Sequence, residues 1–293
     1  MRNFTDSWDY ELLDTSDGER LERWGDIILI RPDPQVIWKT PKNHPLWKKA
    51  HARYHRSKTG GGNWEYYRSI EQDWSISRGD LTFRIKPMNF KHTGLFPEQA
   101  VNWDILRQMI EEDSAAKQRQ IKVLNLFAYT GAATVAALKA GASVTHVDAS
   151  KGMVSWAKEN AVSSGVQEAP VRWLVDDCLK FIQREQRRGN RYDGIILDPP
   201  SYGRGPGGEV WQLEEALFGF LQECVKLLDH DSGFVILNSY TTGLSASVME
   251  YLMRAVLVAR LGGRVYSDEI GIPVSHTDLV LPCGATCIWR NED

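Results

Sequence analysis

The chain has 293 residues, a formal net charge of −3 at pH 7, 42% hydrophobic and 25% charged residues. That length suffices to bury a substantial core, and the composition is that of a globular protein. The charge excludes a protein that coats nucleic acid by bulk positive charge, and no apolar run approaches the ~20 residues that span a bilayer. The four cysteines are widely spaced, so we expect free thiols in a reducing cytoplasm and no metal site.

The first third of the chain is predicted to form a small, mainly-β domain, residues 1–91. Short aromatic or β-branched runs separated by Gly, Pro, Asp or Asn are typical of antiparallel strands. These runs lie at 24–30, 35–38, 64–67, 74–77 and 81–85, with a loop at 59–63. A helix at 97–110 follows, with proline in its first turn.

A basic segment, residues 39–58, lies inside this region. No acidic residue occurs between Asp33 and Glu65. The segment carries Lys39, Lys42, Lys48, Lys49, Arg53, Arg56 and Lys58, interleaved with Trp47 and Tyr54 and preceded by Trp38. Phosphates favour such charge and bases stack on such rings, so the segment predicts contact with RNA. The alternative is a solvated basic segment whose tryptophans belong to the core.

From Ile121 onward, buried apolar runs alternate with helical patterns. Strands are expected at 122–128, 143–148, 171–175, 193–198 and 233–238, with closing strands at 264–270 and 279–289. Helices are expected at 131–140, 150–163, 177–188, 210–228 and 244–261. This alternation predicts an α/β fold with a doubly wound, Rossmann-like sheet of seven strands in a second domain, residues 92–293. Ligands bind such sheets at the carboxyl ends of the strands.

Residues typical of a binding site for a nucleotide-like cofactor lie at these carboxyl ends. Gly131, after the first strand, lets the backbone approach a ligand, and the next helix presents its N-terminal amides. Asp148, closing the second strand, is placed to accept bonds from ribose hydroxyls. Asp177, after the third strand, is placed to accept from an adenine amino group, with Asp176 as the competing candidate. The full set is Asn125, Phe127, Ala128, Tyr129, Thr130, Gly131, Asp148, Ala149, Ser150, Asp176 and Asp177.

Two other cofactor classes are disfavoured at the same loop. A nicotinamide or flavin enzyme would carry Gly-x-Gly-x-x-Gly after the first strand, and residues 125–134 do not supply it. No Gly-x-x-x-x-Gly-Lys-Ser/Thr occurs there either. The order of loop glycine, strand-end Asp, Asp-Asp and then Asp-Pro-Pro is that of an S-adenosylmethionine (SAM) dependent methyltransferase.

The catalytic loop is predicted at Asp198-Pro199-Pro200, after the fourth strand. Two prolines stiffen the backbone and hold the preceding residue extended. The loop carbonyls and Asp198 can then accept hydrogen bonds from an amino group on a planar substrate, and Tyr202 can stack on the base. Positioning is most of what methyl transfer needs. The glycine-rich residues 203–208 that follow suit either a lid or a solvated loop.

At residues 125–131 and Asp198-Pro-Pro-Ser201, the sequence resembles the bacterial RNA methyltransferases related to the large-subunit rRNA cytosine-5 enzymes. The resemblance runs from about His92 to the end of the chain, and Thr93-Gly-Leu-Phe-Pro-Glu-Gln99 matches the family motif Thr-Gly-x-Phe-x-x-Gln. It implies a class I methyltransferase fold, SAM as cofactor and an RNA base as substrate. It also implies that Phe96 and Gln99 help to enclose the cofactor.

The sequence departs from that family in two places. Residues 1–90 do not match the PUA RNA-binding domain that members often carry. The cytosine-5 members have Ser-Cys-Ser after the fifth strand, where this chain has Asn238-Ser239-Tyr240. Cytosine C5 is a poor nucleophile until a thiolate adds to C6. A nitrogen acceptor is therefore at least as compatible with the sequence as carbon.

Other functions remain open at this point. A methyltransferase acting on a small molecule or a protein would use the same scaffold. A catalytically silent SAM- or RNA-binding module would have no need of the intact Asp-Pro-Pro, which argues against that alternative. The sequence does not indicate the oligomeric state.

Overall fold

The structure is a computed structural model that describes residues 1–57, 61–88, 90–204, 208, 210–241, 243–275 and 277–292. Lys58 and part of the predicted loops at 59–63 and 203–208 lie outside the described residues. The chain divides into two compact units. The first unit is Met1–Val101 with Ile270–Cys283, and the second unit is Asn102–Glu269 with Gly284–Asp293. The expected domain boundary between residues 91 and 92 stays a prediction.

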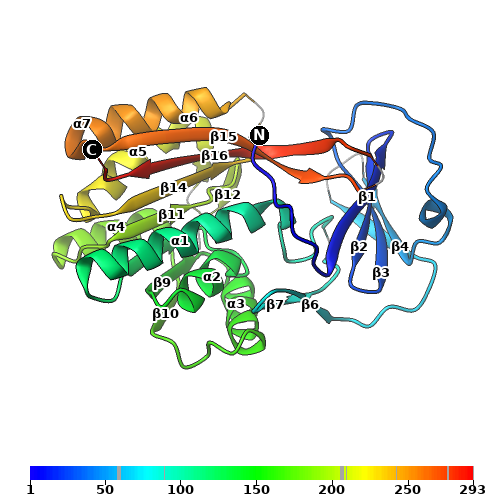
Figure 1. Cartoon of the computed structure of the whole chain (residues 1–293), viewed down its shortest axis with the longest axis horizontal. Helices are drawn as coiled ribbons and strands as arrows, with labels where there is room; N and C mark the ends of the chain where they lie inside the picture. Colours follow the sequence, from blue (N-terminus) through cyan, green and yellow to red (C-terminus); the bar gives the residue numbers. More distant parts are fainter. Residues whose placement is uncertain are drawn as a thin grey trace. The chain divides into compact units, whose positions relative to one another are not determined.

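The first unit is built on a five-stranded sheet (Figure 1). Its strands, in the order β1-β2-β3-β4-β5, are Tyr10–Ser16, Glu19–Trp24, Ile27–Pro32, Ala52–Arg56 and Gly62–Tyr66. Neighbouring strands are antiparallel except β3 and β4, which pair in parallel. A separate hairpin is formed by β6 (Trp74–Arg78) and β7 (Leu81–Ile85). The mainly-β character predicted for this region is confirmed.

Some strands of the first unit differ from the prediction. The run at 24–30 is broken by the turn at Gly25 and Asp26 between β2 and β3. The strand predicted at 35–38 is wrong, because those residues form an irregular connection in which the indole of Trp38 donates to the Thr15 carbonyl. Strands β1, β2 and β4 were not predicted.

Charged side chains inside the sheet explain why β2 is hard to recognise. Glu22 on β2 is fully buried. Its carboxylate accepts hydrogen bonds from the Tyr10 hydroxyl at 2.9 Å and from Arg31 Nη2 at 2.7 Å. Burial alone would raise the pKa of Glu22, but the charges of Arg31 and Arg20 lower it. A buried, paired carboxylate therefore occupies a position where sequence patterns expect an apolar residue.

The second unit contains the seven-stranded sheet, with order β10-β9-β8-β11-β14-β16-β15 (Figure 1). Its strands are β8 (Lys122–Leu126), β9 (Ser143–Asp148), β10 (Val171–Val175), β11 (Gly194–Leu197), β14 (Phe234–Ser239), β15 (Arg264–Pro273) and β16 (Val280–Arg290). Strands β8 to β11 and β14 pair in parallel, and β16 is antiparallel to β14. The predicted Rossmann-like α/β sheet is confirmed.

Helices connect these strands. They are α1 (Ala100–Lys117), α2 (Ala132–Lys139), α3 (Lys151–Ser163), α4 (Cys178–Arg187), α5 (Leu213–Cys224), α6 (Ala246–Met253) and α7 (Ala259–Leu261), with a π-helical segment Arg254–Val258 between the last two. The short hairpin of β12 (Tyr202–Arg204) and β13 (Val210–Gln212) precedes α5. Helix α1 continues past the predicted end at residue 110 and ends at Lys117.

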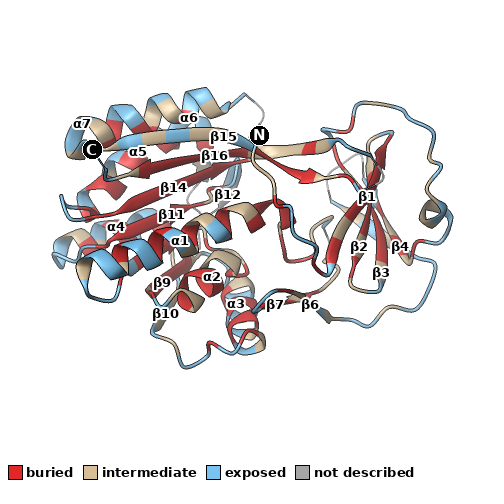
Figure 2. Cartoon of the chain, viewed as in Figure 1, coloured by how far each residue is buried: buried red, intermediate tan, exposed pale blue. Residues whose placement is uncertain are grey.

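The central strands of the second unit's sheet are buried on both faces. An apolar cluster joins alternate residues of β8, β11 and β14 to α4, α5 and α6. The intervening residues of the same strands, such as Val123 and Ile196, are buried as well. Figure 2 shows β11 and β14 buried over their whole length. Parallel strands covered on both faces leave their carboxyl ends as the place for polar loops.

Candidate cofactor and catalytic site

The loop after β8 has an unusual backbone. Phe127 and Tyr129 have positive φ angles of 54° and 52°, which side-chain-bearing residues seldom adopt, and Gly131 follows at 78°. The Ala128 amide donates to the Val147 carbonyl at 3.1 Å. The loop is thus tied to the end of β9, and this contact helps to hold its strained conformation.

Close packing against α3 makes glycine necessary at position 131. A Cβ on Gly131 would lie 2.8 Å from the Cβ of Ala157. The Asn160 side chain, also on α3, donates to the Thr130 carbonyl at 2.8 Å. Helix α3 therefore fixes the turn from which α2 begins, and the first amides of α2 have no hydrogen-bond partner within their own helix.

A series of buried, hydrogen-bonded polar side chains supports this turn. Asn125 Nδ2 donates to Thr134 Oγ1 at 2.9 Å, and Thr134 Oγ1 lies 2.9 Å from His146 Nδ1. Burial lowers the pKa of His146 to about 3, so the imidazole is neutral. Thr134 and His146 were missed by the sequence reasoning, which took Asn125 as a cofactor contact. Asn125 is 2% exposed, and its role at the cofactor stays a prediction.

Asp148 is the acid at the end of β9. Its two carboxylate oxygens accept the backbone amides of Tyr129 and Ser150, each at 2.8 Å. Burial raises the pKa of Asp148, and the two amide bonds oppose that rise. Each carboxylate oxygen has a second acceptor position. Ser150 caps α3 by accepting from the Met153 amide, and Ala149, between the two, is exposed.

The two candidates after β10 are in different environments. The Asp176 carboxylate forms an ion pair with Arg184. Asp177 caps α4, with Oδ1 accepting the Lys180 amide at 2.8 Å. Its second oxygen, Oδ2, accepts no hydrogen bond from the residues that the structure describes. Asp177 therefore has the more open acceptor position of the two.

The Asp-Pro-Pro loop follows β11 in the same unit. Asp198 is half-buried, Pro199 is buried, and Pro200 is exposed. Two contacts hold the loop: the Pro200 carbonyl accepts from Trp211 Nε1 at 2.6 Å, and the Ser201 hydroxyl lies 2.6 Å from that of Thr241. The predicted stiff loop is thus anchored by side chains that the sequence reasoning did not identify.

Trp211 also reaches the cofactor loop. Its ring centroid lies 5.0 Å from that of Phe127 and 5.2 Å from that of Phe220 on α5. The structure therefore brings Phe127 and Pro200, predicted from separate motifs, onto one tryptophan. Tyr202 on β12 is 53% exposed, so its ring is accessible for stacking on a ligand.

No cysteine in this site is suited to act as a nucleophile. Cys178 is buried, and burial raises the pKa of its thiol, which also bonds to the backbone of Phe127. At the end of β14, Asn238 is 3% exposed and accepts from Thr286 Oγ1 at 2.8 Å. Among the described residues, no group of three His, Cys, Asp or Glu side chains could hold a metal ion.

The charged and aromatic side chains of the basic segment have more partners within the protein than its composition suggests. Lys39 pairs with Asp17, and Lys42 and Arg53 pair with Glu19. Its rings are largely occupied, since Tyr54 is buried and the Trp47 indole donates to Asp14 at 2.7 Å. Among the residues of this segment that the structure describes, Lys48, Lys49 and Arg56 are the exposed cations that remain besides Lys39. Phe96 and Gln99 also belong to the first unit.

The second unit has the fold and the loop chemistry of class I methyltransferases. Carboxylate oxygens that can accept hydrogen bonds follow β9 and β10. A backbone turn that only glycine fits follows β8, and the anchored Asp-Pro-Pro loop follows β11. A cofactor with a ribose, an adenine and an amino-acid end fits this donor and acceptor set. No described helix has the length and apolarity to cross a membrane.

Comparison with known proteins agrees with this class. The sequence model described as S-adenosylmethionine-dependent methyltransferase matches residues 43–214. A SAM-dependent methyltransferase of known structure from Agrobacterium tumefaciens is 38% identical, with a TM-score of 0.92 over 99% of this chain and 93% of that one. The chain belongs to the S-adenosylmethionine-dependent methyltransferase family.

More distant similarities extend the comparison. A protein from Streptococcus mutans described as a SAM-dependent methyltransferase shares the fold, at 18% identity and a TM-score of 0.73 over 96% of this chain and 75% of that one. Ribosomal RNA large subunit methyltransferase K/L of Pseudoalteromonas atlantica is 27% identical over 71% of this chain and 30% of its own length. The Shewanella frigidimarina protein of that name is 31% identical over 54% of this chain and 21% of its length. The chain thus spans less than a third of these relatives.

Proposed function

We propose that this SAM-dependent methyltransferase methylates a base in ribosomal RNA. The anchored Asp198-Pro199-Pro200 loop, next to the cofactor loop of the same unit, is the observation that carries the proposal. The names of the K/L relatives support ribosomal RNA as the substrate class. The predicted cytoplasmic location and the absence of a metal stay predictions.

The cofactor is assigned to the loops after β8, β9 and β10. Asp148 accepts the ribose hydroxyls through the second acceptor positions of its oxygens, and Asp177 Oδ2 accepts the adenine amino group. Thr130, Gly131 and the first amides of α2 receive the amino-acid end. Ala128 and Tyr129, with Ala149 and Ser150, complete the assignment within this unit. The contribution implied for Phe96 and Gln99 stays a prediction. The bound cofactor supplies an electrophilic methyl group on a sulfonium.

The substrate base is assigned to the loop after β11. The Pro200 carbonyl is already engaged by Trp211, so the Asp198 carboxylate and the Pro199 carbonyl are the acceptors for the base's amino group. These bonds direct the nitrogen lone pair toward the methyl carbon, and Asp198 accepts the proton that the nitrogen loses. Tyr202 stacks on the base.

The acceptor atom is assigned as nitrogen. Attack by carbon 5 of a cytosine needs a thiolate, and the last two residues of β14 are Asn238 and Ser239. The Cys178 thiol is buried with a raised pKa, which opposes thiolate formation. The exposed cations Lys48, Lys49 and Arg56 of the first unit are assigned to RNA phosphates.

Calorimetric titration with SAM and S-adenosylhomocysteine, followed by transfer of a radiolabelled methyl group to ribosomal RNA, tests this proposal. We expect cofactor binding that Asp148→Ala abolishes, and label in an adenine, guanine or cytosine nitrogen. Lys48→Glu with Lys49→Glu should reduce labelling of RNA without changing cofactor affinity. Label on protein or on a small molecule, but not on RNA, would show that the substrate class is wrong. Binding without any transfer would favour a silent binding module.

A further inference from the structure

A hollow opens at the amino ends of the strands, which is the opposite end of the sheet from the loops assigned to the cofactor. It has a volume of about 690 Å³ and begins at the first residues of β8, β9 and β10, namely Lys122, Ser143 and Val171. The residues after α4, from Gly189 to Tyr192, complete its wall. We name it the amino-edge hollow. It lies wholly within the second unit.

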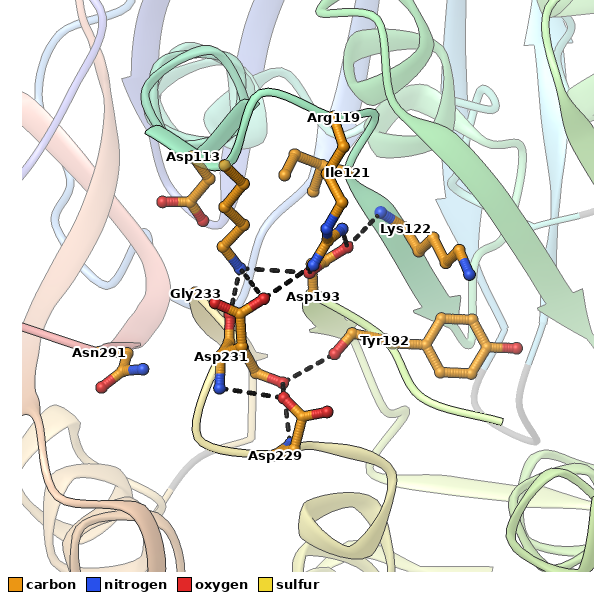
Figure 3. A network of polar contacts seen from close by, with 12 residues as sticks. Asp113, Arg119, Ile121, Lys122, Tyr192, Asp193, Asp229, Asp231, Gly233 and Asn291 are labelled. Carbon is orange, nitrogen blue, oxygen red and sulfur yellow. Dashed lines mark hydrogen bonds and ion pairs between the residues drawn. The ribbon is translucent and has the colours of Figure 1, made fainter. Parts of the chain in front are cut away.

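Three cationic side chains line this hollow: Lys122, Arg172 and Arg191. The Lys122 amide donates to Asp193 at 2.8 Å, but Figure 3 shows its side chain extending away from that carboxylate. Asp193 is satisfied by Arg119, which donates to both of its oxygens at 2.7 Å. Neither the Lys122 ammonium nor Arg191 forms an ion pair with any residue that the structure describes.

One carboxylate lines the hollow, and both of its oxygens already have partners. Glu185 is 0% exposed and accepts hydrogen bonds from Tyr192 at 2.7 Å and Asn190 at 2.8 Å. Arg188 lies 3.1 Å and Arg172 3.5 Å from its oxygens. Burial alone would raise the pKa of Glu185, but these hydrogen bonds lower it. The ionised Glu185 thus pairs with Arg172 of the hollow and with Arg188 at the end of α4, and the side chains that line the hollow keep a net positive charge.

The positive charge continues along α4. Arg184, Arg187 and Arg188 recur at a spacing that places them on one face of the helix. Arg184 pairs with Asp176, and Arg188 pairs with Glu185. Arg187 is exposed and has no ion pair among the described residues. The helix dipole favours arginine in a last turn, which accounts for Arg187 or Arg188. It does not account for the cations at the starts of β8 and β10.

We propose that the amino-edge hollow and the arginine face of α4 bind phosphates of the RNA substrate. This inference rests on the proposed function and assigns the methyltransferase unit an RNA contact of its own. Because the cations lie both in the hollow and on α4, a polyanion fits them better than a single small anion. Ordered cations spread over a surface are the usual way to position a nucleic-acid backbone.

The test removes three of these charges without disturbing Glu185. The variant combines Lys122→Gln, Arg187→Gln and Arg191→Gln. The matched control combines Lys158→Gln, Arg260→Gln and Arg264→Gln, which neutralise one lysine and two arginines exposed elsewhere in the second unit. Binding of a fluorescein-labelled hairpin RNA is measured by anisotropy over a series of KCl concentrations. Calorimetry with S-adenosylhomocysteine and thermal unfolding monitor the cofactor site and the fold.

We expect the test variant to bind RNA about tenfold more weakly than the control, with a salt dependence flatter by about 2 in log–log slope, since each phosphate contact releases counterions. Its cofactor affinity and unfolding temperature should equal those of the control. Equal RNA binding by the two variants would overturn this inference alone. Wild-type protein that binds S-adenosylhomocysteine but no RNA would overturn both this inference and the proposed substrate. Loss of affinity for inorganic phosphate, with RNA affinity retained, would identify a small-anion site instead.

Discussion

Trp211 Nε1 donates a hydrogen bond of 2.6 Å to the carbonyl oxygen of Pro200. The same indole ring packs at 5.0 Å from Phe127. A residue of the β12–β13 hairpin therefore joins the loop assigned to the cofactor to the loop assigned to the substrate. Because methyl transfer depends on the alignment of two groups, we expect Trp211 to act as a positioning residue for the reaction.

Trp211→Phe keeps an aromatic ring against Phe127 and removes the N–H donor. We expect kcat to fall roughly tenfold while affinity for S-adenosylhomocysteine is kept, because only the Pro200 side of the link is lost. Trp211→Ala should weaken cofactor binding as well. Steady-state kinetics and calorimetry on both variants check this. Unchanged kcat in Trp211→Phe would mean that the hydrogen bond does not align the loop.

Gly131→Ala introduces a methyl group where the φ angle is +78° and the Ala157 Cβ would be 2.8 Å away. We expect a loss of about 2–4 kcal/mol in the free energy of unfolding, or of cofactor affinity where the loop shifts instead. Gly141→Ala is the control, since its φ is +84° but nothing lies within 4 Å of its Cβ. That variant should lose only about 1–2 kcal/mol. Similar losses in urea unfolding would exclude a packing role for Ala157.

Asp198→Ala tests the assigned substrate acceptor. We expect turnover to fall roughly 10²- to 10⁴-fold, because the amino group loses its oriented acceptor and the proton its base. Affinity for S-adenosylhomocysteine should remain that of the wild type, since the cofactor is assigned to other loops. Methyl-transfer rates and calorimetry measure the two effects. Wild-type turnover in this variant would remove Asp198 from the mechanism.

Cofactor affinity should depend on pH through Asp148. Burial raises the pKa of this carboxyl, so the acid becomes protonated at a higher pH than an ordinary aspartic acid. Protonation removes acceptor capacity for the ribose, and affinity for S-adenosylhomocysteine should therefore fall as the pH is lowered. Calorimetry in acidic buffers should detect proton release on binding, and Asp148→Asn should abolish both effects. An unaltered pH profile in Asp148→Asn would contradict the ribose assignment.

Stability should fall in acid through His146. Its pKa is lowered by burial to about 3 in the folded protein, so the unfolded chain binds the proton first. The stabilisation is complete above the unfolded pKa and is lost as the pH falls toward the folded one. Between about pH 7 and pH 5, the free energy of unfolding should drop by about 2 kcal/mol through this residue. Urea unfolding should show a smaller drop in His146→Gln, whereas the exposed His230→Gln should behave as wild type.

The sheet of the second unit was predictable because its strands are apolar runs that end at polar loops. Strand β9 was predicted with its observed bounds, and Asp148 and Gly131 were singled out from position alone. The anchors of the predicted catalytic loop were not predictable. Trp211 and Thr241 are distant in sequence from Pro200 and Ser201, and no local pattern indicates that they meet.

The first unit was harder to predict because it buries charge. Strand β2 reads Glu-Arg-Leu-Glu-Arg-Trp, which suggests a solvated segment. In the structure Glu22 is fully buried against Arg31, and Arg20 pairs with Asp33 at 3.2 Å. The basic segment shows the opposite case. It contains no acidic residue, but its cations pair with Asp17 and Glu19, which lie outside the segment, so its sequence overstates its net positive charge.

The way the backbone passes between the two units limits how the protein can be dissected. It crosses at Val101 to Asn102, returns at Glu269 to Ile270, and leaves again at Cys283 to Gly284. The returning residues belong to the first unit, where Leu12 bridges Val274 and the Gly271 amide donates to the Arg2 carbonyl. Expression of residues 1–101 alone would therefore omit part of that unit. A gene that fuses residues 270–283 to the first 101 residues through a designed linker would instead encode both parts of the first unit.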